Sequence, residues 1–312
     1  MTIEDARMKL ASEKAFRLFG LKVSRIDPEL EQLFEASPPD YQIINGVRVY
    51  LPTGDSAITN LSKKLFAFFG LRVSRINAEV DHLNLVEALP LDLQIIRMVR
   101  PYTMTSPARI WALVNAIQYV SENRIKGDIC ECGVWRGGSS MAAALKLKSA
   151  RDFRKLWLYD TFAGMSEPTE HDKVIAGAVP AHNAWKKHQR GDHLNEWCFA
   201  PLDHVRHNMK STGYPLDQTT FVVGKVEQTL TVPSNVPGAI ALLRLDTDWY
   251  ESTKAELETL YDKLSPGGVL IIDDYGHWDG ARRAVDEFFA SRPRKILLDR
   301  IDQGGRIGVK VE

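Results

Sequence analysis

The chain has 312 residues, of which 44% are hydrophobic, and its 40 basic residues balance its 40 acidic residues. This length can bury a complete α/β core with a segment left over, and the balanced charge argues against a nucleic-acid partner. The three cysteines, Cys130, Cys132 and Cys198, suit neither a disulfide framework nor a C-x-x-C metal pair. No apolar run reaches the roughly 18 residues that span a bilayer, and the start M-T-I-E-D lacks the basic head of a signal peptide. We therefore expect a soluble, cytoplasmic protein without a transmembrane segment.

The first hundred residues contain a duplication. The stretch K-A-F-R-L-F-G-L-K-V-S-R-I-D-P-E-L-E-Q-L at residues 14–33 recurs at residues 64–83 with most positions identical. Two copies are too few for a solenoid, which needs at least three. We expect residues 1–100 to form a small α+β appendage that pairs within itself or docks on a partner. Contact of its Phe and Lys faces with a membrane surface is the alternative, and a homo-oligomer is the expected assembly.

A second domain is expected over residues 101–312. After an amphipathic helix, G-D-I-C-E-C at residues 127–132 reads as a short strand, and G-V-W-R-G-G-S-S reads as a glycine-rich turn before a helix that begins near Met141. Gly133 lets the chain turn, and Gly137 lets a ligand approach the backbone. This pattern predicts the first strand and ligand-binding turn of a doubly wound sheet.

The second predicted strand, Leu156 to Tyr159, is followed by Asp160. Nucleotide-binding sheets place the carboxylate that holds a ribose at this position. Residues 162–202 then break the strand–helix alternation, and we interpret them as an insertion that covers the site. The histidines of this insertion are not spaced as tight metal ligands, so we interpret them as lid or surface residues. They are His171, His182, His188 and His193.

The remaining strands are expected at residues 220–223, 239–245, 268–272, 295–299 and 305–311. Between the fourth and fifth strands lies one amphipathic helix, for which Thr253 and Glu256 make a plausible capping box. Strand and helix alternate until a terminal pair of strands. The fold class is therefore predicted to be α/β, with a seven-stranded, mostly parallel, doubly wound sheet.

Four carboxylates follow two of these strands. Asp246 and Asp248 follow the fourth strand, and Asp273 and Asp274 end the fifth. A helical crossover joins parallel neighbours that lie about 4.8 Å apart, so these acids should meet at the edge where open α/β sheets bind ligands. Carboxylates this close repel one another, and a divalent cation with oxygen ligands would hold them together. The alternative is that individual acids cap helices or pair with arginines, of which the candidates are Arg244, Arg282 and Arg283.

The glycine turn distinguishes two classes of nucleotide-binding sheet. It reads E-C-G-V-W-R-G-G-S instead of the dehydrogenase pattern G-x-G-x-x-G. Glu131 would repel a pyrophosphate, which disfavours the alternative of an NAD-binding Rossmann oxidoreductase. S-adenosylmethionine carries a sulfonium and an ammonium but no phosphate, so Glu131 near its amino-acid end and Asp160 at its ribose are electrostatically suitable.

Five motifs in order extend this reading: Y-T-M-T-S-P-x-R, G-D-I-x-E-C-G-V-W-R-G-G-S, Y-D-T-F-x-G-M-S-E-P, L-R-L-D-T-D-W-Y-E-S-T and I-D-D-Y. From about Pro101 onward the chain resembles the macrocin O-methyltransferase family, which contains metal-dependent sugar O-methyltransferases of antibiotic biosynthesis. The resemblance implies a Rossmann-like class I methyltransferase fold, S-adenosylmethionine as methyl donor and Mg²⁺ or another divalent cation. It also implies a sugar or glycoside acceptor, with a phenolic acceptor as the alternative.

The resemblance also implies roles for individual residues. Asp246, Asp273 and Asp274 match the Mg²⁺ ligands, and Asp248 matches the general base. Glu131, Gly133 and Asp160 match the cofactor site. Further candidates for cofactor binding are Thr103, Met104, Trp135, Gly137, Ser139, Thr161 and Gly224.

The expected mechanism starts from the poor nucleophilicity of a neutral sugar hydroxyl. A cation on the three aspartates could chelate two vicinal hydroxyls and acidify the reacting one, while Asp248 takes the proton. If the chain is extended at this point, Asp246 and Asp248 project to the same side. His277, which titrates near neutrality, is the competing base.

Overall fold

The chain divides into two compact units, Met1–Val86 and Glu87–Glu312. The computed structural model describes residues 24–25, 47–48, 85, 87–192 and 194–312. In the first unit, strands β1 (Ser24–Arg25) and β2 (Val47–Arg48) pair antiparallel. Apart from Ser24 and Arg25, the duplicated segments at residues 14–33 and 64–83 lie outside the described residues.

The sequence suggested a boundary at about residue 100. The second unit of the structure begins earlier, at Glu87. Helix α5 (Pro90–Val99) packs on the helices that follow it. Its Asp92 is 1% exposed and forms an ion pair of 2.7 Å with Lys146 of helix α7 (Gly138–Ser149). A buried ion pair of this kind is costly to break from one side, so α5 belongs to this unit.

The second unit contains one twisted sheet with the order β12-β13-β11-β10-β3-β4-β9. These strands are β3 (Asp128–Cys132), β4 (Leu156–Asp160), β9 (Thr219–Val223), β10 (Ile240–Leu245), β11 (Leu264–Ile272), β12 (Asp299–Arg300) and β13 (Arg306–Val309). The five strands from β11 to β9 are parallel, while β13 runs antiparallel to β11 and to β12. The chain winds outward in opposite directions from β3 and β10, which places a ligand crevice at their carboxyl ends.

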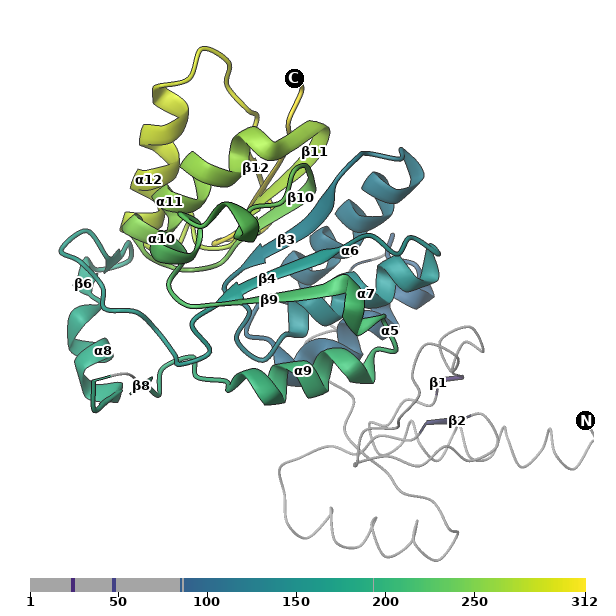
Figure 1. The fold of residues 1–312 in the computed structure, drawn as a ribbon, viewed down its shortest axis with the longest axis horizontal. Coiled ribbons are helices and arrows are strands. Elements are labelled where there is room, and N and C mark those ends of the chain that lie inside the picture. Colours follow the sequence, from purple (N-terminus) through teal and green to yellow (C-terminus); the bar gives the residue numbers. More distant parts are fainter. Residues whose placement is uncertain (1–23, 26–46, 49–84, 86, 193) are drawn as a thin grey trace, which may run out of the picture. The chain divides into compact units, whose positions relative to one another are not determined.

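Helices cover both faces of this sheet (Figure 1). On one face, α5, α6 and α9 pack on α7, and on the other face α10 and α12 pack on α11. The helices not yet given are α6 (Pro107–Glu122), α8 (His182–His188), α9 (Leu202–Ser211), α10 (Val226–Thr229), α11 (Tyr250–Leu260) and α12 (Asp279–Ala290). Short 3-10 turns are η1 (Arg100–Tyr102), η2 (Leu216–Gln218), η3 (Pro233–Asn235) and η4 (Tyr261–Lys263).

The two-sided cover explains the apolar central strands. Every residue of β10 is buried, including Ile240, Leu242 and Leu243 at 0% exposure. A strand covered on both faces must be apolar throughout. Arg244 is the exception in β10, and its side chain is also only 2% exposed. A buried guanidinium needs charged partners. For Arg244 these are Glu131, Asp246 and Asp273.

The capping box expected at Thr253 and Glu256 is wrong. Helix α11 begins three residues earlier, at Tyr250, whose N–H donates to Asp172 Oδ1 at 2.8 Å. Glu256 is fully buried and accepts a hydrogen bond from Thr247 Oγ1 at 2.9 Å. The carboxylate that receives the first free N–H of this helix therefore comes from the insertion, which is distant in sequence.

The sixth strand expected at residues 295–299 is shorter than predicted. Its β pairing is limited to β12, and before that strand Lys295 Nζ donates to the carbonyl oxygens of Phe289, Ala290 and Arg292. These contacts hold the segment against the carboxyl end of α12. The sequence of the segment is suited to a strand, but in the structure the Lys295 side chain caps the carboxyl end of α12.

The insertion at residues 162–202 contains two small hairpins around α8. Strand β5 (Lys173–Val174) pairs with β6 (Val179–Pro180), and β7 (Gln189–Arg190) pairs with β8 (Leu194–Asn195). Its backbone attaches to the main body where Val174 bridges to Trp278. The helices in the described part of the chain are all too short or too polar to cross a membrane.

Candidate active site

The carboxyl ends of β3, β4, β10 and β11 open into a cavity of about 540 Å³. All but one of the sequence-predicted site residues line it: Thr103, Met104, Glu131, Gly133, Trp135, Ser139, Asp160, Thr161, Gly224, Asp246, Asp248, Asp273, Asp274 and His277. Gly137 does not line the cavity, and His171 and His188 also lie away from it. The fold therefore brings together residues that the sequence spreads over 175 positions.

Gly137 has a different role from the one expected. It is the N-cap of α7 with φ of 89°, and its N–H donates to the carbonyl of Val134 at 2.8 Å. That left-handed conformation favours glycine. It lets the turn close and α7 begin at Gly138, earlier than the expected start near Met141.

Gly133 allows the glycine turn to lie against the acid cluster. An added Cβ at this position would lie 1.9 Å from the carbonyl oxygen of Asp246, and φ is 84°. No side chain fits so close to a backbone oxygen. The Asp246 N–H also donates to the carbonyl of Cys132 at 2.8 Å. The turn after β3 and the acids after β10 are therefore in direct backbone contact.

Asp160 organises the same turn. Its Oδ2 accepts the N–H groups of Val134 at 2.7 Å and Trp135 at 2.9 Å, and its Oδ1 accepts the N–H of Phe162 at 2.7 Å. Burial raises the pKa of Asp160, and these hydrogen bonds oppose that rise. A carboxylate can accept about four hydrogen bonds. The fourth contact of Asp160, from Thr161 Oγ1, is long at 3.5 Å, so this is the position where Asp160 can accept a bond from a ligand hydroxyl at the cavity.

Glu131 is buried at the end of β3. Its Oε1 accepts a hydrogen bond from Arg244 Nη1 at 2.6 Å, and its Oε2 accepts one from the Ser140 hydroxyl. Burial raises the pKa of Glu131, while Arg244 and Ser140 act in the opposite direction. Glu131 therefore lines the cavity and is also paired with Arg244.

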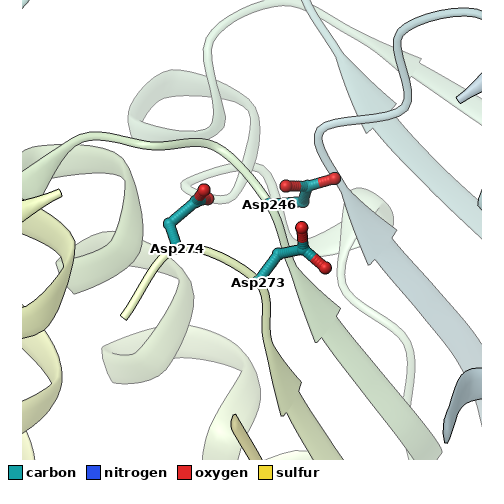
Figure 2. Close-up of side chains that lie close together, drawn as sticks. All are labelled: Asp246, Asp273 and Asp274. Carbon is teal, nitrogen blue, oxygen red and sulfur yellow. The ribbon is translucent and has the colours of Figure 1, made fainter. Parts of the chain in front are cut away.

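Asp246, Asp273 and Asp274 form a tight acid cluster. One carboxylate oxygen from each lies within 4.8 Å of the others. Figure 2 shows the three carboxylates reaching a common space from the ends of two neighbouring strands. The side chain of Asp246 is 25% exposed and that of Asp273 only 3%, so the cluster opens to the cavity on the Asp246 side.

Two arginines compensate part of this charge. Arg244 Nη1 lies 2.8 Å from Asp246 Oδ2, and its Nη2 lies 2.7 Å from Asp273 Oδ1. Arg109 pairs with the other oxygen of Asp273 and, through Nε at 3.0 Å, with Asp302. Burial opposes the charge of Arg244, but the adjacent carboxylates outweigh it and raise its pKa well above the ordinary value.

The acid cluster fits a hard divalent cation. Among the described residues Asp274 makes no ion pair, and Asp246 keeps one carboxylate oxygen without a guanidinium partner. The donor set consists only of carboxylate oxygens, which Mg²⁺ prefers. The expected pairing of acids with Arg244 is also present. The cluster is therefore compatible both with a bound cation and with pairing of individual acids to an arginine. The structure supplies no partner from Arg282 or Arg283, which pair with Asp286 and Glu287.

Asp248 does not lie in an extended segment, as the sequence argument assumed. Its φ is 69°, and the next residue, Trp249, donates its N–H back to the carbonyl of Thr247 at 2.8 Å. The N–H of Asp248 donates to Asp274 Oδ2 at 3.2 Å, and Asp248 Oδ1 accepts the Trp278 indole N–H at 2.5 Å. The left-handed turn is a strained conformation for a residue with a side chain, and it turns Asp248 out of the strand direction toward Asp274 and Trp278.

His277 is the exposed alternative at the cavity wall. Partial burial and the charge of Arg109 lower its pKa. Its ring stacks edge-on against Trp278 with 4.9 Å between the ring centroids. Neutral imidazole can accept a proton, so the chemistry of a base remains available to it.

Sequence reasoning missed three residues that shape this site. Arg109 stood in the motif Y-T-M-T-S-P-x-R, which could have identified it. Asp302 and Trp278 had no local signal, because their partners, Arg109 and Asp248, come from other elements.

A doubly wound sheet with this strand order, a glycine turn without a dinucleotide pattern and an acid cluster beside it define a class I methyltransferase. A family model for the macrocin O-methyltransferases (TylF) matches residues 97–307, and the chain belongs to this family. It is an O-methyltransferase, as the resemblance read from its motifs predicted. The fold implies S-adenosylmethionine as the methyl donor.

The relatives of the chain are named as O-methyltransferases, and the name of one of them includes a rhamnosyl group. The chain is 37% identical over 209 residues, 67% of this chain and 74% of the relative, to 8-demethyl-8-(2,3-dimethoxy-alpha-L-rhamnosyl)-tetracenomycin-C 4'-O-methyltransferase of Streptomyces olivaceus. It is 32% identical over 212 residues, 67% of this chain and 77% of the relative, to mycinamicin III 3''-O-methyltransferase of Micromonospora griseorubida. The solved structure of the O-methyltransferase NovP covers 68% of this chain and 83% of its own, with 30% identity and a TM-score of 0.58.

Proposed function

We propose that this protein is an S-adenosylmethionine- and divalent-metal-dependent O-methyltransferase that acts on a sugar hydroxyl of a glycosylated natural product. The observation that carries the proposal is the position of the acid cluster. Asp246, Asp273 and Asp274 share one cavity with the glycine turn, and their carboxylate oxygens lie within 4.8 Å of one another. A relative whose named substrate carries a rhamnosyl group supports the choice of acceptor.

The cofactor is proposed to lie along the glycine turn. Glu131 offers a negative charge to the ammonium of the donor, and Asp160 offers a hydrogen-bond acceptor to its ribose. Thr103, Met104 and Gly224 complete this part of the cavity wall, with Trp135, Ser139 and Thr161 beside the turn. A donor bound along this turn would have its methyl group near the acid cluster, because the turn contacts the backbone of Asp246.

The acid cluster supplies the means to activate the acceptor. Asp246, Asp273 and Asp274 would hold a divalent cation, which when bound lowers the pKa of an oxygen that it contacts. Asp248 lies beside Asp274 with its carboxylate at the cavity, where it can take the proton of the acceptor hydroxyl. The hydroxyl oxygen then forms a bond to the methyl carbon as the bond from carbon to sulfur breaks.

The geometry of Asp248 favours it over His277 as the base. Burial and the charge of Asp246 raise the pKa of Asp248 to about 8, and its carboxylate accepts a hydrogen bond from the Trp278 indole N–H. His277 is more exposed, and its ring packs edge-on against Trp278. We therefore keep His277 as the second candidate for the base.

The function is tested with a panel of glycosylated natural products whose terminal sugar has two adjacent free hydroxyls. Free sugars and a catechol serve as comparison acceptors, and each is incubated with S-adenosylmethionine and Mg²⁺. We expect mass spectrometry to detect the gain of one methyl group on a glycoside, and we expect the donor, but not NAD, to raise the melting temperature. Stabilisation by NAD alone, or methylation of the catechol alone, would contradict the proposal.

Asp248→Asn should lower kcat by roughly 10²-fold to 10⁴-fold, because the acceptor proton loses its base. The affinity for S-adenosylhomocysteine should stay near wild type, and calorimetry with Mn²⁺ should show a much smaller loss of metal affinity than in Asp246→Asn. If Asp248→Asn loses metal as completely as Asp246→Asn, Asp248 is a ligand and His277 becomes the base.

We also propose that the protein is cytoplasmic, assembles as a homo-oligomer and takes no nucleic-acid partner. The balanced charge of the chain supports the last point. The duplication within residues 1–100 is proposed to serve assembly or recognition of the acceptor, because the site residues all lie in the second unit.

A further inference from the structure

Trp278 lies where three parts of the molecule meet. It is the N-cap of α12, its backbone bridges to Val174 of the insertion, and its side chain is 5% exposed. The adjacent residue His277 accepts the N–H of Ile175 through its carbonyl at 2.9 Å. Residues 174 and 175 of the insertion are therefore joined by a β-bridge and a hydrogen bond to the backbone of His277 and Trp278.

The indole ring is held by a cluster of aromatic side chains. Its centroid lies 4.9 Å from Trp249 at 74° and 6.1 Å from Trp197 at 59°. Trp197 belongs to the insertion, while Trp249 directly follows Asp248. The edge-to-face contact with Trp249 and the tilted contact with Trp197 leave the ring little freedom to rotate, so its N–H points in one direction.

That N–H donates to Asp248 Oδ1 at 2.5 Å. The other contact of Asp248 is its own N–H to Asp274 Oδ2, and its backbone has a positive φ of 69°. A side chain on a strained turn needs an external partner to keep one orientation. Trp278 is the partner that the structure provides, and it does not itself carry a group that can take a proton at neutral pH.

We propose that Trp278 is a positioning residue, which orients the carboxylate of Asp248 toward the acceptor and makes this orientation depend on the docked insertion. This inference rests on the proposed role of Asp248 as the base. The inference gives the insertion at residues 162–202 a function beyond covering the cavity. Val174 and Trp197 of the insertion hold Trp278 in place, and the Trp278 indole orients the Asp248 carboxylate.

Trp249 provides a matched control. It belongs to the same aromatic cluster, is 2% exposed and also uses its indole N–H, which donates to the carbonyl of Ser166 at 2.9 Å. Trp249→Phe and Trp278→Phe therefore remove the same atoms from the same cluster. They differ in that Trp278→Phe removes the hydrogen bond to Asp248.

The test compares these two variants in the full chain, with the glycoside that the acceptor panel identifies as the probe. We expect Trp278→Phe to lower kcat by roughly 10-fold to 100-fold, the effect of one hydrogen bond to a charged group. The KM for the acceptor and the affinity for S-adenosylhomocysteine should stay near wild type. Trp249→Phe should lower kcat much less, although it lies next to Asp248.

A double-mutant cycle separates positioning from packing. If Trp278 acts through Asp248, Trp278→Phe should cause no further loss of kcat in the Asp248→Asn background. Effects of the two changes that multiply, or equal effects of Trp278→Phe and Trp249→Phe, would overturn the inference while leaving the proposed base in place. Full activity of Asp248→Asn would instead overturn the base assignment and, with it, this inference.

Two further measurements do not depend on the fold of the Phe variant, and the second of them does not depend on turnover. Replacement of Trp278 by 3-benzothienylalanine keeps the ring shape and removes only the N–H, so it should reproduce the kcat of Trp278→Phe. Hydrogen exchange should also become faster at the amides of Asp248 and Trp249 in this variant. Unchanged exchange at both amides would show that the indole does not hold this turn.

Discussion

Asp246→Asn and Asp273→Asn are each expected to lower kcat by about 10³-fold or more. A cation that acidifies the reacting hydroxyl is worth several kcal/mol, and each 1.4 kcal/mol or so is a factor of ten in rate. Binding of S-adenosylhomocysteine should survive, because neither carboxylate belongs to the glycine turn. Titration with Mn²⁺ in a calorimeter should show that both variants lose metal affinity.

The two variants should differ in stability. Asp273 is held by Arg244 and Arg109 and is 3% exposed, whereas the Asp246 side chain is 25% exposed and pairs with Arg244 alone. Asp273→Asn should therefore lower the melting temperature more than Asp246→Asn. Asp286→Asn, in an exposed pair with Arg282, is the control and should change neither rate nor stability. Full activity of chelator-treated protein that retains no metal would contradict the metal role.

Arg244→Met should lower the free energy of unfolding by about 3–5 kcal/mol, the effect of removing one partner from a buried ion pair. Its guanidinium contacts Glu131, Asp246, Asp273 and the Thr105 hydroxyl at 2.6 to 2.8 Å. Without it, Glu131 and Asp273 would remain buried beside each other with fewer compensating charges. Denaturant unfolding followed by tryptophan fluorescence measures the loss.

Arg283→Met is the matched control for this prediction. Arg283 pairs with Glu287 on α12, and both side chains are 49% exposed, so the loss of stability should be much smaller than for Arg244→Met. Arg244→Lys should be intermediate, because an ammonium cannot reach four partners as a planar guanidinium does. If Arg244→Met is no less stable than Arg283→Met, the buried cluster does not depend on its arginine.

The sequence predicts neighbouring strands and site residues wherever they follow from a pattern of residues that are close together in the chain. The apolar run at residues 239–245 and the acids directly after it are adjacent in the chain, and a helical crossover forces the next parallel strand alongside. This is why Asp246, Asp273 and Asp274 could be expected to meet. The same reasoning failed at Thr253 and at residues 295–299, where contacts from distant elements decide the local structure.

Asp248 shows the limit most clearly. The pattern L-D-T-D-W predicts that its side chain follows the alternation of a strand, but its backbone turns left-handed. That turn is stabilised by Asp274, which accepts the Asp248 N–H, and by Trp278, which donates its indole N–H to the Asp248 carboxylate. None of these partners is near Asp248 in sequence.

The amino-acid sequence by itself determined the doubly wound sheet, the family and 14 of the residues that line the cavity, because periodicity, glycine turns and strand-end acids are short-range features. The tertiary structure alone decided how the charges are shared and which way the base points. Arg244 lies between three carboxylates from three strands or strand ends, and Trp278 joins the insertion to Asp248. Such contacts depend on the relative placement of packed elements, which no local pattern of residues specifies.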